Sequence, residues 1–145
     1  MKTYKIIILI IISLFVLSAC ASGPFYDDFS DTGSTWTLID DDPEAAIYYT
    51  NGMLRIDILT PLMFVWSNPG KNYTDVIVEV DAKSIGYAEY DEFGLICRYT
   101  SETDFYTAMI GTDGYFAIYK GDQENGIIEV NEDAYGFSDA IKGYK

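Results

Sequence analysis

Residues 75–83, DVIVEVDAK, alternate between two sets of side chains. The apolar set comprises Val76, Val78, Val80 and Ala82, and the second, mostly charged set comprises Ile77, Glu79, Asp81 and Lys83. A period of two places the sets on opposite sides of an extended chain, one toward a core and one toward water. We therefore predict a half-buried β-strand here, the clearest in the chain.

Other β-rich runs lie on either side of this segment. Turn dipeptides join two pairs of them: Asn51-Gly52 lies between residues 47–50 and 53–59, and Asp113-Gly114 lies between residues 105–110 and 115–120. Both dipeptides are typical of β-hairpins, whose tight turns need a positive φ. Further candidate strands are residues 63–66, 93–100 and 127–130. Short strands with evenly spaced turns, and no sustained helical period, predict an all-β antiparallel sandwich.

The N-terminus is typical of an exported protein. Two lysines precede an apolar run over residues 6–16, which is shorter than the about 20 apolar residues that span a bilayer. The following Leu17-Ser18-Ala19-Cys20 resembles the lipobox of bacterial lipoproteins. That resemblance implies a signal peptide over residues 1–19, lipidation and acylation of Cys20, and a short tether over residues 20–24. We expect the remaining domain, residues 25–145, on the extracytoplasmic face of the cell membrane or the outer membrane.

Composition excludes several classes of function. The chain of 145 residues carries a formal charge of −14 and contains no histidine. Such an acidic surface disfavours nucleic acid and anionic lipid as partners, and it is compatible with neutral glycans or a divalent cation. Without histidine, Ser-His-Asp and Cys-His catalysis and His-based zinc sites are excluded.

Several segments together resemble bacterial laminin-G-like domains. They are FYDDFSD at residues 25–31 with Trp36, YTDVIVEVDA at residues 73–82, FGLICRY at residues 93–99, DFY at residues 104–106 and DGYF at residues 113–116. The resemblance implies a two-sheet jelly roll of the concanavalin A-like lectin/glucanase superfamily. Members of the family usually continue for several further strands, so we expect an incomplete jelly roll. In some relatives a second cysteine in that later region faces the position of Cys97.

The aromatic content points to carbohydrate binding. Sugars bind through their apolar C–H faces to aromatic rings and through their hydroxyls to polar groups. The candidate binding residues are Trp66, Tyr48, Tyr106 and Arg98. Strict alternation places Arg98 on the same strand face as Ile96. Packing of each ring into a core is the alternative for every one of these aromatic residues.

Acidic residues offer two further hypotheses. Glu79-Val80-Asp81 matches the first half of the Glu-x-Asp-x-x-Glu strand of family-16 glycoside hydrolases, but Ser84 occupies the position of the third acid. The catalytic pair is then missing, so hydrolase activity is the least favoured function. Asp40, Asp41 and Asp42 form an acidic loop whose oxygen ligands suit Ca²⁺, and a solvated surface loop is the alternative.

These observations favour a lipid-anchored, non-catalytic module that binds carbohydrate. The alternative is a structural or protein-interaction domain of the cell envelope without a small ligand. In that case an exposed strand edge would accept a strand from an envelope protein.

Overall fold

The structure of the protein is a computed structural model that describes residues 24–86 and 90–141. It contains two antiparallel sheets, one of two strands and one of five, which confirms the predicted all-β, sandwich-like class. The one helical element among the described residues is a 3-10 turn, η1 (Glu132–Ala134). No described helix is long and apolar enough to cross a membrane. The chain divides into two compact units, with the boundary between Thr74 and Asp75.

The first unit contains the predicted hairpin at Asn51-Gly52. Strand β1 (Ala45–Thr50) pairs with β2 (Met53–Ile58), and the two turn residues have φ angles of 51° and 71°. Two positive φ angles in a two-residue loop match the right-handed twist of the strands that they join. Ile47, which is fully buried, also forms a two-way backbone bridge with Ile39. This bridge protects the outer edge of β1.

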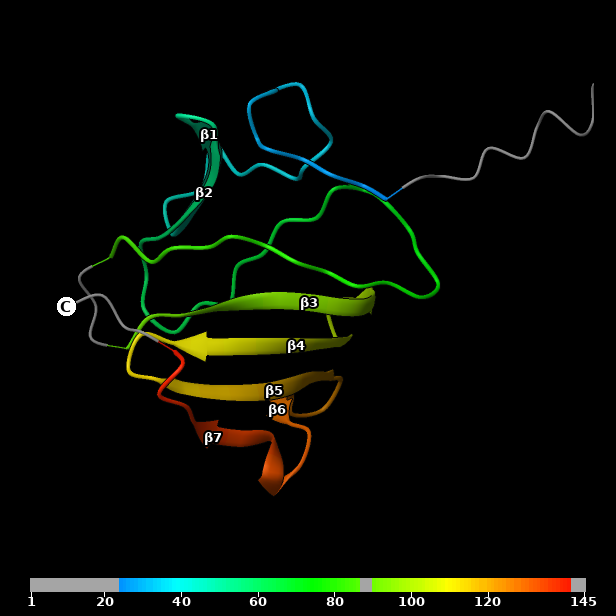
Figure 1. Ribbon diagram of the computed structural model, residues 1–145, viewed down its shortest axis with the longest axis vertical. Helices are drawn as coiled ribbons and strands as arrows, with labels where there is room; N and C mark the ends of the chain where they lie inside the picture. Colours follow the sequence, from blue (N-terminus) through cyan, green and yellow to red (C-terminus); the bar gives the residue numbers. More distant parts are fainter. Residues whose placement is uncertain (1–23, 87–89, 142–145) are drawn as a thin grey trace, which may run out of the picture. The chain divides into compact units, whose positions relative to one another are not determined.

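The second unit contains the larger sheet (Figure 1). Its strands are β3 (Glu92–Ser101), β4 (Asp104–Gly111), β5 (Tyr115–Asp122), β6 (Gly126–Glu129) and β7 (Tyr135–Phe137). The path runs β3-β4-β5-β6, and β7 pairs with the first half of β5 while β6 pairs with its second half. The predicted hairpin at Asp113-Gly114 is confirmed as the β4–β5 connection.

One side of this sheet is called the tyrosine face. One row crosses β3, β4, β5 and β6 and consists of Ile96, Thr107, Tyr119 and Glu129. The next row crosses β3, β4, β5 and β7 and consists of Gly94, Met109, Ala117 and Tyr135. Phe105 lies at one end of this face, and the pair Tyr115 and Phe137 lies at the other. Phe105, Thr107 and Ala117 are at most 3 % exposed. The core of the second unit therefore lies on the tyrosine face, from Phe105 to Ala117.

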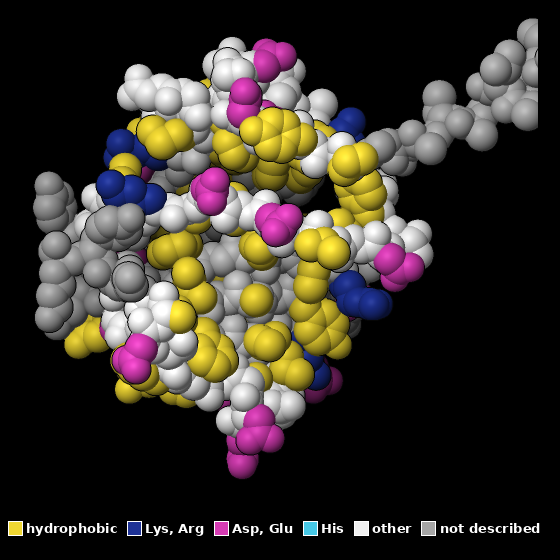
Figure 2. All heavy atoms as spheres, viewed as in Figure 1, with side chains coloured by type: hydrophobic (Ala, Val, Ile, Leu, Met, Phe, Trp, Pro, Cys, Tyr) yellow, Lys and Arg dark blue, Asp and Glu magenta, His cyan; other side chains and the backbone are white. Residues whose placement is uncertain are grey.

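The opposite side is called the apolar face. Its rows across β3, β4 and β5 are Phe93, Ile110 and Phe116, then Leu95, Ala108 and Ile118, then Cys97, Tyr106 and Lys120. Its large side chains on β4 and β5 remain about two-fifths exposed, for example Ile118 at 43 %. Hydrophobic side chains spread across the viewed side of the molecule, including the region that β3–β5 occupy (Figure 2).

Two predicted strands are absent from the described residues, because residues 75–83 and residues 63–66 form no ladder. Residues 25–31, which resemble the opening strand of laminin-G-like domains, form no ladder either. Contrary to the prediction, residues 75–83 are unpaired as a strand in this structure. Alternation determines which side chains share a face, whereas a strand also needs a hydrogen-bonded neighbour. Residues 25–31 instead form a loop in which the Asp27 carboxylate accepts hydrogen bonds from the Phe29 amide and from the Trp36 indole.

Candidate functional site

Tyr48 belongs to a polar cluster on the outer face of the β1–β2 hairpin. Its hydroxyl donates a 2.8 Å hydrogen bond to Asp57, and Arg55 Nε donates a 2.7 Å hydrogen bond to the other oxygen of the same carboxylate. The Arg55 guanidinium also lies 5.8 Å from the centre of the Tyr48 ring. The hydrogen bond from Arg55 is the main reason that the pKa of Asp57 is lowered. Both Asp57 oxygens are engaged, so this cluster orients Tyr48.

Trp66 lies in a half-buried loop of the same unit, on a different element from Tyr48. Its ring centre is 5.6 Å from that of Phe64. Hydrogen bonds from the Ser67 hydroxyl to the Thr37 carbonyl and from the Thr37 amide to the Asn68 carbonyl hold this loop against residues 35–37. Trp66 therefore contributes to packing between loops.

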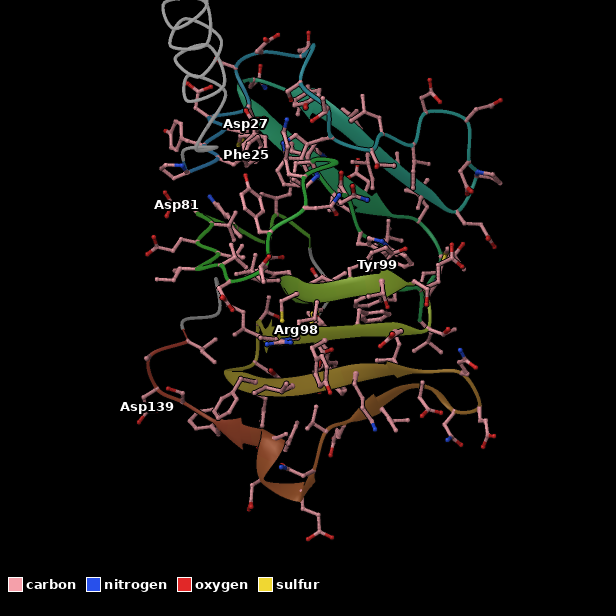
Figure 3. All side chains as sticks on the ribbon, turned by 90° about the vertical axis from the view of Figure 1, so that its right-hand side faces the viewer. Phe25, Asp27, Asp81, Arg98, Tyr99 and Asp139 are labelled. Carbon is pink, nitrogen blue, oxygen red and sulfur yellow. The ribbon has the colours of Figure 1, made fainter. Side chains whose placement is uncertain are left out.

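Arg98 and Tyr106 lie on neighbouring strands of the second unit. Arg98 has a φ of 51°, and the pairing of β3 with β4 is irregular between Cys97 and Ser101. Such a bulge breaks the alternation of side chains. Tyr99 stacks on Phe105 with ring centres 6.3 Å apart, so Tyr99, and not Arg98, continues the face of Ile96, contrary to the prediction from strict alternation. Both residues belong to β3, and they lie on opposite sides of its ribbon in Figure 3.

The remaining predicted positions do not form a ligand cluster. Asp42 accepts hydrogen bonds from the amides of Glu44 and Ala45, so its carboxylate shapes the loop before β1. No group of three or more Asp, Glu or Cys side chains able to share a metal ion occurs within residues 24–86 and 90–141. Cys20, the predicted lipidation site, lies outside the described residues.

An aromatic cluster that the sequence did not predict occupies one end of the tyrosine face. Tyr115 stacks on Tyr135 with ring centres 5.2 Å apart and an interplanar angle of 16°. The rings of Tyr115 and Phe137 lie edge to face, with their centres 5.3 Å apart. These rings stay accessible: Tyr115 is 38 % exposed, Tyr135 48 % and Phe137 57 %. The Phe137 ring lies against Gly114 so closely that any side chain there would displace it. We call Tyr115, Tyr135 and Phe137 the ring cluster.

Carboxylates surround the ring cluster. Glu129 lies opposite Tyr119 in the β5–β6 ladder, and Asp113 accepts a hydrogen bond from the Tyr115 amide. Partial desolvation, followed by the Asp113 charge, raises the pKa of Glu92. The pKa of Tyr135 is also raised, by desolvation first and then by the neighbouring Tyr115, Asp113, Glu129 and Glu92. The rings therefore lie in a negative field.

A sequence signal for this cluster exists in retrospect. Tyr135-Gly136-Phe137 alternates two rings with a glycine, and the Gly136 position is filled by the Phe116 ring from the apolar face. Three residues are too few for a periodicity argument, so the sequence predicts no strand there.

Comparison with known proteins adds no relative: no family model, no curated protein and no solved structure matches this chain. The site must therefore be interpreted from its own chemistry.

Proposed function

We propose that the protein is a non-catalytic carbohydrate-binding module, held by a lipid on Cys20 at the extracytoplasmic face of a bacterial membrane. The ring cluster is the observation that carries the binding function. The lipobox-like Leu17-Ser18-Ala19-Cys20 supports the anchor and the location.

The ring cluster meets both requirements of sugar recognition. Two stacked tyrosines and a phenylalanine offer accessible apolar surface for the C–H face of a pyranose ring. The neighbouring carboxylates of Asp113 and Glu129 are acceptors for sugar hydroxyls. The rings project from paired strands, which hold a binding surface more rigidly than a loop does.

Thermal melting of the full chain in detergent, with a panel of soluble oligosaccharides, tests this function. A ligand that binds only the folded state raises the melting midpoint by mass action. We expect one glycan class to raise the midpoint, and we expect Tyr135→Ala to abolish that shift. Tyr73→Ala is the matched control, because Tyr73 is 44 % exposed and belongs to the first unit. If no glycan class shifts the midpoint, or if both variants respond alike, the ring cluster is not a sugar site.

A second function, protein interaction, is favoured by the apolar face. Exposed Ile110, Phe116 and Ile118 form a continuous surface of a kind that another layer normally covers. If an envelope protein docks there, Ile118→Glu should abolish its cross-linking to this chain, whereas Tyr135→Ala should leave the cross-linking unchanged. The opposite pattern would assign the interaction to the ring cluster.

A further inference from the structure

The free edge of β3 can accept another strand. Within the described residues β3 pairs with β4 alone. The Thr112 amide donates to the Asp91 carbonyl, so the backbone polar groups of Asp91 point toward β4. Because the direction alternates along a strand, Glu92, Gly94 and Ile96 present their backbone N–H and C=O groups to the free edge. Unpaired polar groups in a row are a template for a further strand.

Residues 75–83 have the alternating pattern of such a strand, and they belong to none of the ladders that the described residues form. Their apolar side chains are exposed, with Val76 at 53 %, Val78 at 44 % and Val80 at 49 %. Docking of this run on a sheet is favourable because it removes the apolar surface of the valines from water. The segment and the β3 edge both belong to the second unit.

A side-chain contact already holds the two together at one end. The Ser84 hydroxyl donates a 3.1 Å hydrogen bond to the Asp91 carboxylate. Ser84 directly follows the segment, and Asp91 directly precedes β3. The same carboxylate lies against Gly86, where a Cβ atom would displace it. The contact between Ser84 and Asp91 therefore sets a register for antiparallel pairing.

We propose that residues 75–83 dock onto the free edge of β3 as a sixth, antiparallel strand, with Ser84 opposite Asp91. In this register Ala82, Val80 and Val78 lie opposite Phe93, Leu95 and Cys97. The apolar set of the segment thereby extends the apolar face by one strand.

The charged set supports the same register. Lys83 comes opposite Glu92, an opposite-charge pair of the kind that stabilises antiparallel sheets. A slip by one residue would instead move Val78 and Val80 to the tyrosine face, and Glu79 and Asp81 to the apolar face. Docking also closes the β3 edge against strands of other chains, which is how native sheets avoid association through their edges.

Cys97 provides a direct reporter for this register. It is a free, exposed cysteine, and the proposal places Val78 opposite it in a non-hydrogen-bonded pair. The Cα atoms of such pairs lie about 4.5 Å apart, which is within the range of about 4.4–6.8 Å that a disulfide spans. Val78→Cys is therefore introduced into the full chain carrying Cys20→Ser, and the two thiols are oxidised with diamide, which takes up their two hydrogen atoms.

We expect Val78→Cys to form an intramolecular disulfide, seen as a monomer whose mass is lower by two hydrogens. Glu79→Cys is the matched control, because its side chain would point to the other face, and we expect its rate to be lower by about tenfold or more. Val76→Cys and Val80→Cys test registers displaced by two residues. Equal rates for Val78→Cys and Glu79→Cys would overturn the proposal, and so would a fastest rate at Val76→Cys or Val80→Cys. Mainly disulfide-linked dimers would also overturn it.

Amide hydrogen exchange of the unmodified chain gives an independent measurement. We expect the amides of Glu92, Gly94 and Ile96 to be protected, because they would donate to the docked strand. Exchange of these three amides at the rate of unstructured peptide would contradict the docking regardless of how the cysteine variants behave.

Discussion

Replacement of Phe105 by alanine tests which face of the large sheet holds the core. Phe105 is 1 % exposed, and its ring stacks on Tyr99. A Cβ atom at Gly121 would come within 2.9 Å of the ring, so the ring packs directly on that backbone, and Gly121 has no side chain to refill the space. Burial and cavity effects of Phe→Ala in a core cost about 3–5 kcal/mol. Loss of the ring pair adds about 0.5–1.5 kcal/mol, so we expect a cost in the upper half of the core range.

Tyr106→Ala is the matched control, because Tyr106 is the next residue and lies on the apolar face at 40 % exposure. Its partial exposure limits the expected cost to about 1–2 kcal/mol. Urea unfolding followed by far-ultraviolet circular dichroism measures both free energies by linear extrapolation. An equal or larger cost for Tyr106→Ala would refute the assignment of the core to the tyrosine face.

Three further predictions concern the hairpin, its polar cluster and the anchor. Asp57→Asn should cost up to about 1 kcal/mol at pH 7, because the exposed ion pair with Arg55 is solvent-screened. The pKa of Asp57 is lowered in the folded state, so the stability that its carboxylate contributes is present above the unfolded pKa and is lost as pH falls through the folded pKa. Thermal melting of the parent chain and of Asp57→Asn across pH 2–7 should show the difference between their midpoints vanish in acid. Gly52→Ala should cost about 1 kcal/mol in urea unfolding, because φ is 71° and nothing crowds the added Cβ, so a change near zero would contradict the strain argument. Cys20→Ser should abolish incorporation of a fatty-acid label in bacteria, and continued labelling would rule out Cys20 as the lipidation site.

Local signals account for the parts of the fold that the sequence predicted correctly. The hairpins at Asn51-Gly52 and Asp113-Gly114 depend on turn chemistry within a few residues, and both are confirmed. Pairing of residues 75–83 depends on a partner farther along the chain, which periodicity cannot identify. Strand β7 is too short to show a period at all.

The candidate site was harder to predict than the fold. Tyr115 and Tyr135 are distant in sequence and meet because β7 returns to the first half of β5. That return is a property of topology, and no spacing rule predicts it. The left-handed backbone at Arg98 likewise interrupts the alternation that the sequence suggested. Individual aromatic residues were reasonable candidates, but their grouping required the strand order.

Isothermal titration of the full chain with the oligosaccharide that gives the largest thermal shift tests the carbohydrate-binding proposal most directly. The account predicts saturable binding that Tyr135→Ala weakens by about tenfold or more, equivalent to about 1.4 kcal/mol, while Tyr73→Ala leaves it unchanged. Unchanged affinity in Tyr135→Ala would contradict the account, because a sugar would then bind without the stacked rings of β5 and β7.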